Sequence, residues 1–418
     1  MTQRSLALFI VAVLSLSVAA RADDWTEFRG PTGQGISTAR NLPTRWSKTE
    51  NVVWRKAISG KGWSSPVLHG GRIYLTSAVP IEGKRAGDQS LEALCVDAAT
   101  GELVWRERVF LQDGATAPLP QPKNGHASPT PVVSGGRLYV HFGHQGTACL
   151  NLAGDILWRN DTIKYDPRHG NGGSPILAGG ALVFSCDGYK QRFVIALDRD
   201  SGKRLWRHDR RGPSVRKFSF TTPLLIAVGG RQQVISPGSD VVGAHDPRTG
   251  QEIWRVRYET GYSVIPRPVY GHGLVYVVTG YNTPRVLAIR PTGEGDVTET
   301  HVEWETDRGA PHTPSLLLVD DELYMVSDKG VARCLDARSG KLHWRERIGG
   351  NYSASPVYAD GNIYFQNEQG DGTVIEPGKR FKLLAKNSLG ERTFASYAVA
   401  DGTLFIRSET HLYRIAAR

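Results

Sequence analysis

The chain has 418 residues, of which 40% are hydrophobic, and 51 Lys and Arg against 41 Asp and Glu give a formal net charge of +10 at pH 7. After the N-terminus no segment is apolar enough to span a bilayer, which argues against a membrane-spanning domain. The Lys and Arg residues form no dense run, so an ordinary, mildly basic surface is one interpretation of the charge.

The first residues predict a secretory signal. Arg4 supplies a positive start, residues 6–20 are a largely apolar run, and Ala20-Arg21-Ala22 has the small-x-small pattern of a signal peptidase site. The run is shorter than the roughly 20 residues of a membrane helix; a buried N-terminal helix is the alternative. We expect residues 1–22 to be a signal peptide, cleaved after Ala22, and the mature chain to be periplasmic or secreted.

The predicted mature chain keeps a net charge of +8. An exported protein does not meet nucleic acid, so we expect the charge to favour anionic envelope polymers or an acidic partner. No cysteine follows the apolar run, so no lipid anchor is expected.

The next segments are an arm and an isolated strand. Residues 23–51 contain no repeat, and we expect an arm packed on the outside or across one face of the main domain. Val52-Val53-Trp54-Arg55-Lys56 then has the alternation of a strand and the Trp-Arg ending of later segments.

A motif that reads small-x-Asp-x-x-Thr/Ser-Gly-x-x-x-Trp recurs along the rest of the chain. Complete copies occupy residues 95–105, 196–206, 244–254 and 334–344, with a shorter copy at 149–158 and a lengthened one at 288–304. The Asp accepts backbone N–H groups in a turn, and the Gly takes the positive φ of a tight hairpin. The Trp then offers a large flat surface that can seal one repeat against the next.

Short strands are predicted to open each repeat. The openings are marked at residues 64–66, 127–129, 173–175, 221–223, 266–268, 312–314, 355–356 and 395–397. Each repeat then has four short strands and no helical period, which predicts an all-β, eight-bladed β-propeller over residues 52–418. The last repeat lacks one strand, which residues 52–56 would supply to close the ring. A seven-bladed ring with an extra hairpin is the structural alternative.

The cysteines follow the same repeat. Cys95, Cys149 and Cys334 occupy the small apolar position of the motif, where other copies carry Ala. Equivalent positions of different blades are too far apart to bridge, so we expect buried thiols rather than disulfides. Cys186 has no evident partner.

These repeats resemble the tryptophan-docking repeat of the PQQ-like propeller superfamily. The segments 25–31 and 62–66 are similar to those of secreted bacterial PQQ-like-repeat proteins. The resemblance implies one of two classes. Quinoprotein dehydrogenases hold PQQ on a Trp floor beneath a disulfide of adjacent cysteines, with Ca²⁺ bound by Glu, Asn and Asp. BamB-type proteins use the propeller as a scaffold without a cofactor.

The chain departs from the dehydrogenase pattern because no two cysteines are adjacent and the long insertions that cover that active site are absent. No calcium triad can be assigned to particular residues. The missing lipid-attachment cysteine also departs from a strict BamB role. His141 and His144 are three apart at the end of a strand and do not share a face, so no metal site is predicted.

A candidate ligand site lies just ahead of the opening strands, where a propeller gathers loops at one end of its channel. Aromatic rings there would stack on a ligand, and polar side chains would orient it. The predicted residues are Trp63, Asn124, His126, His169, Asn171, Lys217, Phe220, Tyr262, His312, Asn351, Tyr352 and Arg392. The alternative is that the aromatic residues only plug the channel. Lys217 and Arg392 would favour an anionic ligand.

We therefore expect a monomeric, non-catalytic propeller that binds an envelope protein or an anionic glycan at one face of its channel. No catalytic residue is predicted. The alternative function is a PQQ-dependent oxidoreductase, with PQQ and Ca²⁺, that acts on an alcohol or a sugar.

Overall fold

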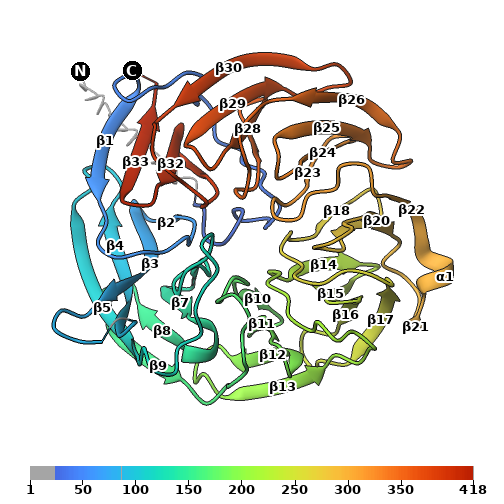
Figure 1. The fold of residues 1–418 in the computed structure, drawn as a ribbon, viewed down its shortest axis with the longest axis horizontal. Helices are drawn as coiled ribbons and strands as arrows, with labels where there is room; N and C mark the ends of the chain where they lie inside the picture. Colours follow the sequence, from blue (N-terminus) through green and yellow to red (C-terminus); the bar gives the residue numbers. More distant parts are fainter. Residues whose placement is uncertain (1–23, 86, 418) are drawn as a thin grey trace, which may run out of the picture.

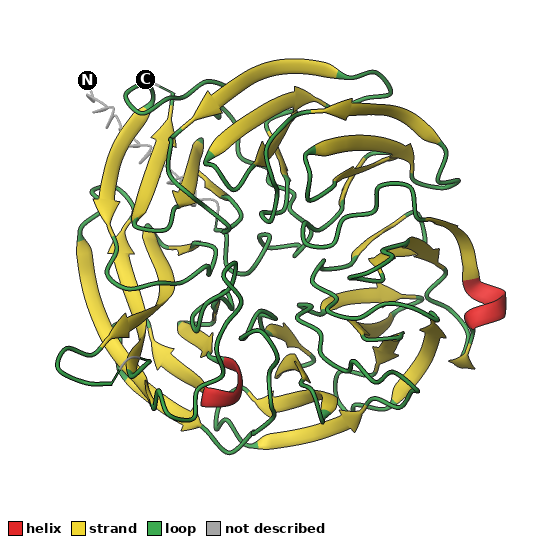
Figure 2. Ribbon diagram, in the orientation of Figure 1, coloured by secondary structure: helices red, strands yellow, loops and turns green. Residues whose placement is uncertain are grey.

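The computed structural model describes residues 24–85 and 87–417, so the predicted signal peptide lies outside the described residues. The described chain forms eight antiparallel sheets that stand as blades around a central channel (Figure 1). Strands and loops make up nearly all of it, apart from α1 (Thr298–His301) and a 3-10 turn at Gly143–Gln145 (Figure 2). The prediction of an all-β, eight-bladed propeller is confirmed.

Each blade is a meander whose first strand is short and lies nearest the channel. Blades 1 to 4 contain, from the channel outward, β2 (Val67–His69), β3 (Arg72–Pro80), β4 (Gln89–Asp97) and β5 (Leu103–Gln112); β6 (Val132–Ser134), β7 (Arg137–His141), β8 (Thr147–Asn151) and β9 (Ile156–Asn160); β10 (Ile176–Ala178), β11 (Ala181–Asp187), β12 (Arg192–Asp198) and β13 (Arg204–Asp209); and β14 (Leu224–Val228), β15 (Arg231–Gly238), β16 (Val241–His245) and β17 (Glu252–Arg257).

Blades 5 to 8 follow the same order. They contain β18 (Val269–Gly271), β19 (Leu274–Val278), β20 (Val286–Ile289) and β22 (Val302–Thr306); β23 (Leu317–Val319), β24 (Glu322–Val326), β25 (Val331–Asp336) and β26 (Leu342–Arg347); β27 (Val357–Ala359), β28 (Asn362–Gln366), β29 (Asp371–Glu376) and β30 (Lys382–Ser388); and β31 (Ala398–Ala400), β32 (Thr403–Arg407), β33 (His411–Ala416) and β1 (Val52–Ala57). The insertion in the blade 5 motif adds β21 (Gly295–Asp296), which pairs in parallel with β17 of blade 4.

The ring closes as predicted. β1, from the start of the described chain, pairs antiparallel with β33 near its end, with Trp54 opposite Arg414 and Lys56 opposite Leu412. The N-terminal strand is therefore the outermost strand of blade 8. The eight-bladed interpretation holds, and the seven-bladed alternative does not.

The motif tryptophans join neighbouring blades. The Nε1 of Trp158 donates to the carbonyl of Arg199 at 3.1 Å, and that of Trp206 donates to the carbonyl of Pro247 at 2.9 Å, each in the hairpin turn of the next blade. The indole also covers the turn glycine of that blade, so Gly202 and Gly250 have no room for a Cβ. Hydrophobic clusters accordingly lie between blades, as where Trp158 of blade 2 packs with Phe184 of blade 3.

Blade 5 breaks this pattern because its turn is lengthened. Trp254 donates instead to the Oε1 of Gln233 at 2.8 Å, and the Nε2 of Gln233 donates to the carbonyl of Pro291 at 3.1 Å. The Gln233 amide thus bridges the Trp254 indole and the lengthened turn of blade 5, whereas a turn of ordinary length accepts the indole hydrogen bond directly.

Two of the opening strands begin two residues later than predicted. Blade 2 opens at Thr130-Pro131 ahead of β6, and blade 6 opens at Ser315-Leu316 ahead of β23. Ser128-Pro129 duplicates the opening signal just upstream of Thr130, and no proline follows Ser315, so the Pro marker pointed to the wrong residue in both blades.

Residues 24–51 cross one end of the channel, visible as the blue segment in the middle of the ring (Figure 1). The backbone of Trp25 exchanges two hydrogen bonds with Leu68 of blade 1, at 3.0 and 2.8 Å. Arg267 of blade 5 donates to the carbonyl of Phe28, and Ser37 donates its N–H to Tyr358 of blade 7 at 2.9 Å. The segment therefore ties blades on opposite sides of the ring.

All four cysteines are buried and none forms a disulfide. Within residues 24–85 and 87–417, no helix has the length and apolar character needed to cross a membrane.

Candidate functional site

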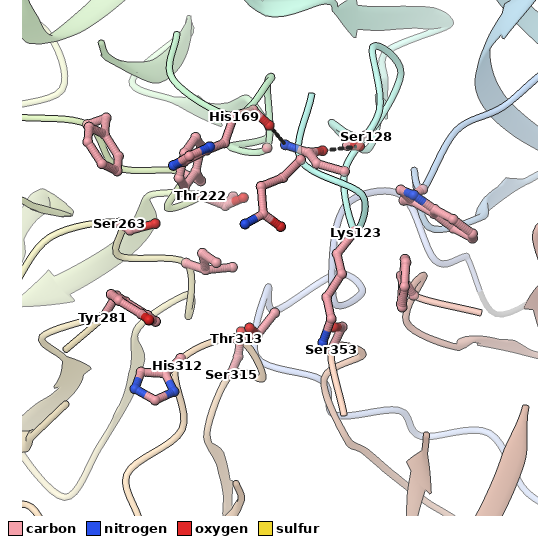
Figure 3. A pocket seen from close by; sticks show the side chains of 18 of the residues that line it. Lys123, Ser128, His169, Thr222, Ser263, Tyr281, His312, Thr313, Ser315 and Ser353 are labelled. Atoms are coloured by element: carbon pink, nitrogen blue, oxygen red, sulfur yellow. Dashed lines mark hydrogen bonds between the residues drawn. The ribbon is translucent and has the colours of Figure 1, made fainter. Parts of the chain in front are cut away.

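A cavity of about 840 Å³ opens at the end of the channel opposite the arm. Its walls are the connections that lead into the innermost strands, and Phe28 of the arm reaches it from below. The hairpins between the second and third strands add Tyr189 and Tyr281. The fold thus collects residues from every part of the chain into one space (Figure 3).

A ring of hydroxyl groups lines the cavity. In each blade but the fifth, a Ser or Thr stands two residues before the innermost strand, and its oxygen accepts the N–H of the matching residue in a neighbouring blade at 2.9–3.1 Å. The members are Ser65, Thr130, Ser174, Thr222, Ser315, Ser355 and Ser396, and all of them line the cavity. Blade 5 has Arg267 in this place, and its guanidinium holds the arm.

Two groups of aromatic rings form the walls. Trp63 and Phe394 meet edge to face with centroids 4.6 Å apart. In the other group Tyr262 lies 5.6 Å from both Phe218 and Tyr281, and Tyr281 lies 5.3 Å from His312. Phe218 and Phe394 are buried, Tyr281 is exposed and the other rings are half-buried. Together they present flat surfaces to a ligand.

Basic groups outnumber acidic ones around the cavity. Lys123, Arg168 and Arg216 line it, whereas Asp328 is the one carboxylate among the described residues that line it. The Arg216 guanidinium lies 4.7 Å from the centre of the Tyr262 ring and donates to its hydroxyl. Asp328 accepts the backbone N–H of His312 at 2.6 Å. Burial alone would raise the pKa of Asp328, but hydrogen bonds from His312 lower it, so the carboxylate stays ionised and engaged.

An ion pair crosses the mouth of the cavity. Lys123, in the connection between blades 1 and 2, places its Nζ 2.7 Å from the Oε1 of Glu368 in blade 7. Ser353 donates to the same oxygen at 2.6 Å, and Figure 3 shows it beside Lys123. Glu368 is buried, so this pair fixes the connection over the channel rather than leaving it loose.

Six of the predicted site residues line the cavity, namely Trp63, Asn124, His169, Phe220, Tyr262 and His312. Asn124 also shapes the rim, since its Nδ2 donates to the carbonyl of His169 at 2.9 Å. Burial lowers the pKa of His169, which favours a neutral ring.

The structure does not bring the other six to the cavity lining. Asn171 is buried and donates to the carbonyl of Phe142 at 3.1 Å. His126 and Tyr352 are buried behind the wall, and Arg392 stacks 4.6 Å from the Phe394 ring on the outer rim. Lys217 and Asn351 lie outside the lining. Neighbouring positions of one loop separate in this way: Asn124 and His169 line the cavity, whereas His126 and Asn171, each two residues further on, do not. The sequence does not reveal which side chains of a loop face the channel.

The sequence did not point to Lys123, Phe28 or the hydroxyl ring as parts of the site. The Ser and Thr residues were visible as markers of opening strands, and only the ring geometry turns their oxygens toward one channel. Lys123 gave no signal, because its partner Glu368 is distant in sequence.

The described residues that line the cavity offer few of the ligands that calcium prefers. Ca²⁺ takes six to eight oxygen ligands, usually with several carboxylates, and Asp328 is the one carboxylate among the described lining residues. Within the described parts of the chain, no group of three or more His, Cys, Asp or Glu side chains is placed to hold a metal ion.

Fold and site together define a tryptophan-docked, eight-bladed propeller with a ligand-sized cavity at one end of its channel. The chain belongs to the family of PQQ-like repeat proteins whose model is described as outer membrane protein assembly factor BamB, which matches residues 88–330 and 301–380. A comparison with curated proteins gives no match.

Among solved structures, the chain is similar to BamB from Moraxella catarrhalis, with a TM-score of 0.61 and 13% identity over 88% of this chain and 97% of that one. It is also similar to a europium-containing methanol dehydrogenase, with a TM-score of 0.66 and 12% identity over 94% of this chain and 89% of that one. At these identities the likeness establishes the fold alone. The fold is shared by a binding scaffold and an enzyme, so it does not decide function.

Proposed function

We propose that this propeller is a non-catalytic binding protein of the bacterial envelope that holds a segment of an anionic glycan in the channel cavity. The observation that supports this most directly is the lining of the cavity, where aromatic rings alternate with hydroxyl, amide and basic groups. Sugars present flat apolar faces edged with polar groups, so this mixture suits them better than an apolar peptide. The family description supports an envelope location.

The test uses Trp63→Ala, with Trp206→Ala as its matched control. Trp63 lies at the cavity and Trp206 between blades, so the same truncation separates binding from stability. We expect Trp63→Ala to weaken the binding of a galacturonate oligomer in titration calorimetry at least tenfold with little change in melting temperature. Trp206→Ala should cost about 3–5 kcal/mol of unfolding free energy. The proposal would be contradicted if wild type and Trp63→Ala bound the glycan with equal affinity. It would also be contradicted if the protein bound no glycan and captured an envelope protein instead.

A PQQ-dependent oxidoreductase remains the alternative because a methanol dehydrogenase shares the fold. Addition of PQQ with Ca²⁺ or a lanthanide ion to the purified protein discriminates between the two. Saturable PQQ binding with dye reduction by an alcohol or a sugar would favour the enzyme.

A further inference from the structure

The hydroxyl ring has donor protons that the protein does not use. Each oxygen of Ser65, Thr130, Ser174, Thr222, Ser315, Ser355 and Ser396 accepts a backbone N–H, which occupies one lone pair. A hydroxyl also has one O–H to donate. Within residues 24–85 and 87–417 none of these seven O–H groups has a protein acceptor, although each side chain is at least 96% buried.

The hydroxyl protons are left unused because the backbone groups of this ring act as donors and the hydroxyl oxygens as acceptors. Because the N–H groups already donate to the Ser and Thr oxygens, the hydroxyl protons are not needed within this ring and are free to turn toward the channel. Seven blades repeat the arrangement, so the hydroxyl ring places a belt of hydrogen-bond donors at the inner end of the cavity. We call these seven hydroxyl groups the hydroxyl belt. Arg267 interrupts the belt at blade 5, where its guanidinium faces the arm instead.

The charges around the belt also favour a ligand group that accepts hydrogen bonds and carries negative charge. Arg168 and Arg216 line the cavity above the belt, while Lys123 is paired with Glu368. Asp328, the one carboxylate among the described residues that line the cavity, is engaged by His312. A group that arrives at the belt therefore meets donors and positive charge rather than competing acceptors. Buried donors without a partner are unfavourable, which makes an acceptor-rich group the natural occupant.

We propose that the hydroxyl belt binds the acidic group of the ligand, so that the protein prefers sugars bearing a carboxylate or a sulfate over neutral sugars. This inference rests on the proposed function, because it assigns a ligand class to the same cavity. The aromatic walls hold the sugar face, and the belt receives the oxyanion.

The experiment compares three probes of matched length, namely oligomers of galacturonate, of sulfated galactose and of galactose. The variant Ser355→Ala/Ser396→Ala removes two adjacent hydroxyls of the belt. Its partner Ser355→Thr/Ser396→Thr keeps them, and threonine already serves at positions 130 and 222. Ser339→Ala is the control elsewhere, since Ser339 donates to Asp336 in a hairpin turn on the far face. The ratio of acidic to neutral affinity does not depend on the folded fraction, so a loss of stability in the Ala variant does not obscure the result.

We expect wild type to bind at least one acidic oligomer tenfold or more tightly than the neutral one. The ratio should fall toward one in Ser355→Ala/Ser396→Ala and persist in the Thr variant and in Ser339→Ala. The carboxylated and sulfated probes identify which acid is preferred. A ratio unaffected by loss of both hydroxyls would overturn the belt while the proposed function stands. A wild-type ratio of one would overturn the belt and reduce the proposed function to glycan binding without a preference for acidic sugars. Absence of binding to all three probes would overturn both.

Discussion

At the residue scale, a docking tryptophan and a turn glycine act as a pair across five of the blade boundaries, at Gly101, Gly154, Gly202, Gly250 and Gly340. The Trp304 Nε1 donates to the carbonyl of Ala337 at 3.1 Å, and its ring covers Gly340 in the same turn. Gly340 has φ 71°, so the position excludes a side chain for two separate reasons, backbone conformation and contact with the indole. The recurrence of Gly and Trp in one motif thus reflects a contact between different blades.

This pair predicts a difference between two glycines. In Gly340→Ala a new Cβ would stand 2.8 Å from the Trp304 Cδ2, whereas Gly361, with φ 73°, has open space around the same position. We expect Gly361→Ala to cost about 1–2 kcal/mol, the typical penalty for a left-handed alanine, and Gly340→Ala to cost clearly more. Denaturant unfolding of both variants measures the difference. Equal losses would mean that the indole contact adds nothing.

At the scale of elements, closure depends on β1. Trp54 of β1 donates to the carbonyl of Ala98 in blade 1 at 3.2 Å, while β1 itself pairs with β33 in blade 8. Arg55 adds an ion pair with Glu391. One strand therefore completes the last blade and docks it onto the first.

We expect Trp54→Ala to lower the unfolding free energy by about 3–5 kcal/mol, because the ring is buried and its removal leaves a cavity at the seam. Deletion of residues 51–58 should be more damaging, since it exposes the edge of β33. Thermal unfolding measures both changes, and Trp206→Ala at an ordinary blade boundary is the reference. A wild-type melting temperature in the deletion variant would show that β1 does not close the ring.

The strands were predictable and the site was predictable only in part, for one physical reason. The motif from Asp198 to Trp206 combines a turn, a positive φ and a docking ring within a few residues, so the sequence displays it directly. The contact between Lys123 and Glu368 joins the connection between blades 1 and 2 to a loop of blade 7. It depends on how the whole ring positions these two loops, and no local sequence pattern encodes it. His126 and Tyr352 were assigned to the rim because the loop was recognised, but the direction of each side chain depends on packing.

At the scale of the whole molecule, the arm crosses one end of the channel, and the cavity opens at the other end. Arg267 links the arm to the ring: its Nε donates to the carbonyl of Pro223 at 3.0 Å, and its Nη2 lies 3.2 Å from Glu27. The blade that lacks a belt hydroxyl therefore uses the same position to hold the arm, in addition to the contacts that the arm makes with blades 1 and 7. At position 267 the chain therefore has a guanidinium that contacts Phe28 and Glu27 of the arm, in place of a hydroxyl that would continue the belt.

This exchange predicts that Arg267→Ser releases the arm without opening the ring. The new hydroxyl matches those of the other blades, whereas the bonds to Phe28 and Glu27 are lost. We expect limited proteolysis to cleave within residues 24–51 at least tenfold faster, with the remaining propeller resistant. Arg285→Ser, which removes an ion pair with Glu305 in the same blade, is the control. Unchanged protection of the arm would show that Arg267 is not its anchor.

The pairing of β1 with β33 also constrains the order of events during biosynthesis. Val52 is made before blades 1 to 7, whereas its partner Ile415 belongs to β33 of blade 8. The first strand must therefore wait, unpaired, until blade 8 has been made, and the ring cannot close on a product that lacks this blade. A chain terminated before β33 would keep an open edge that quality-control proteases can recognise.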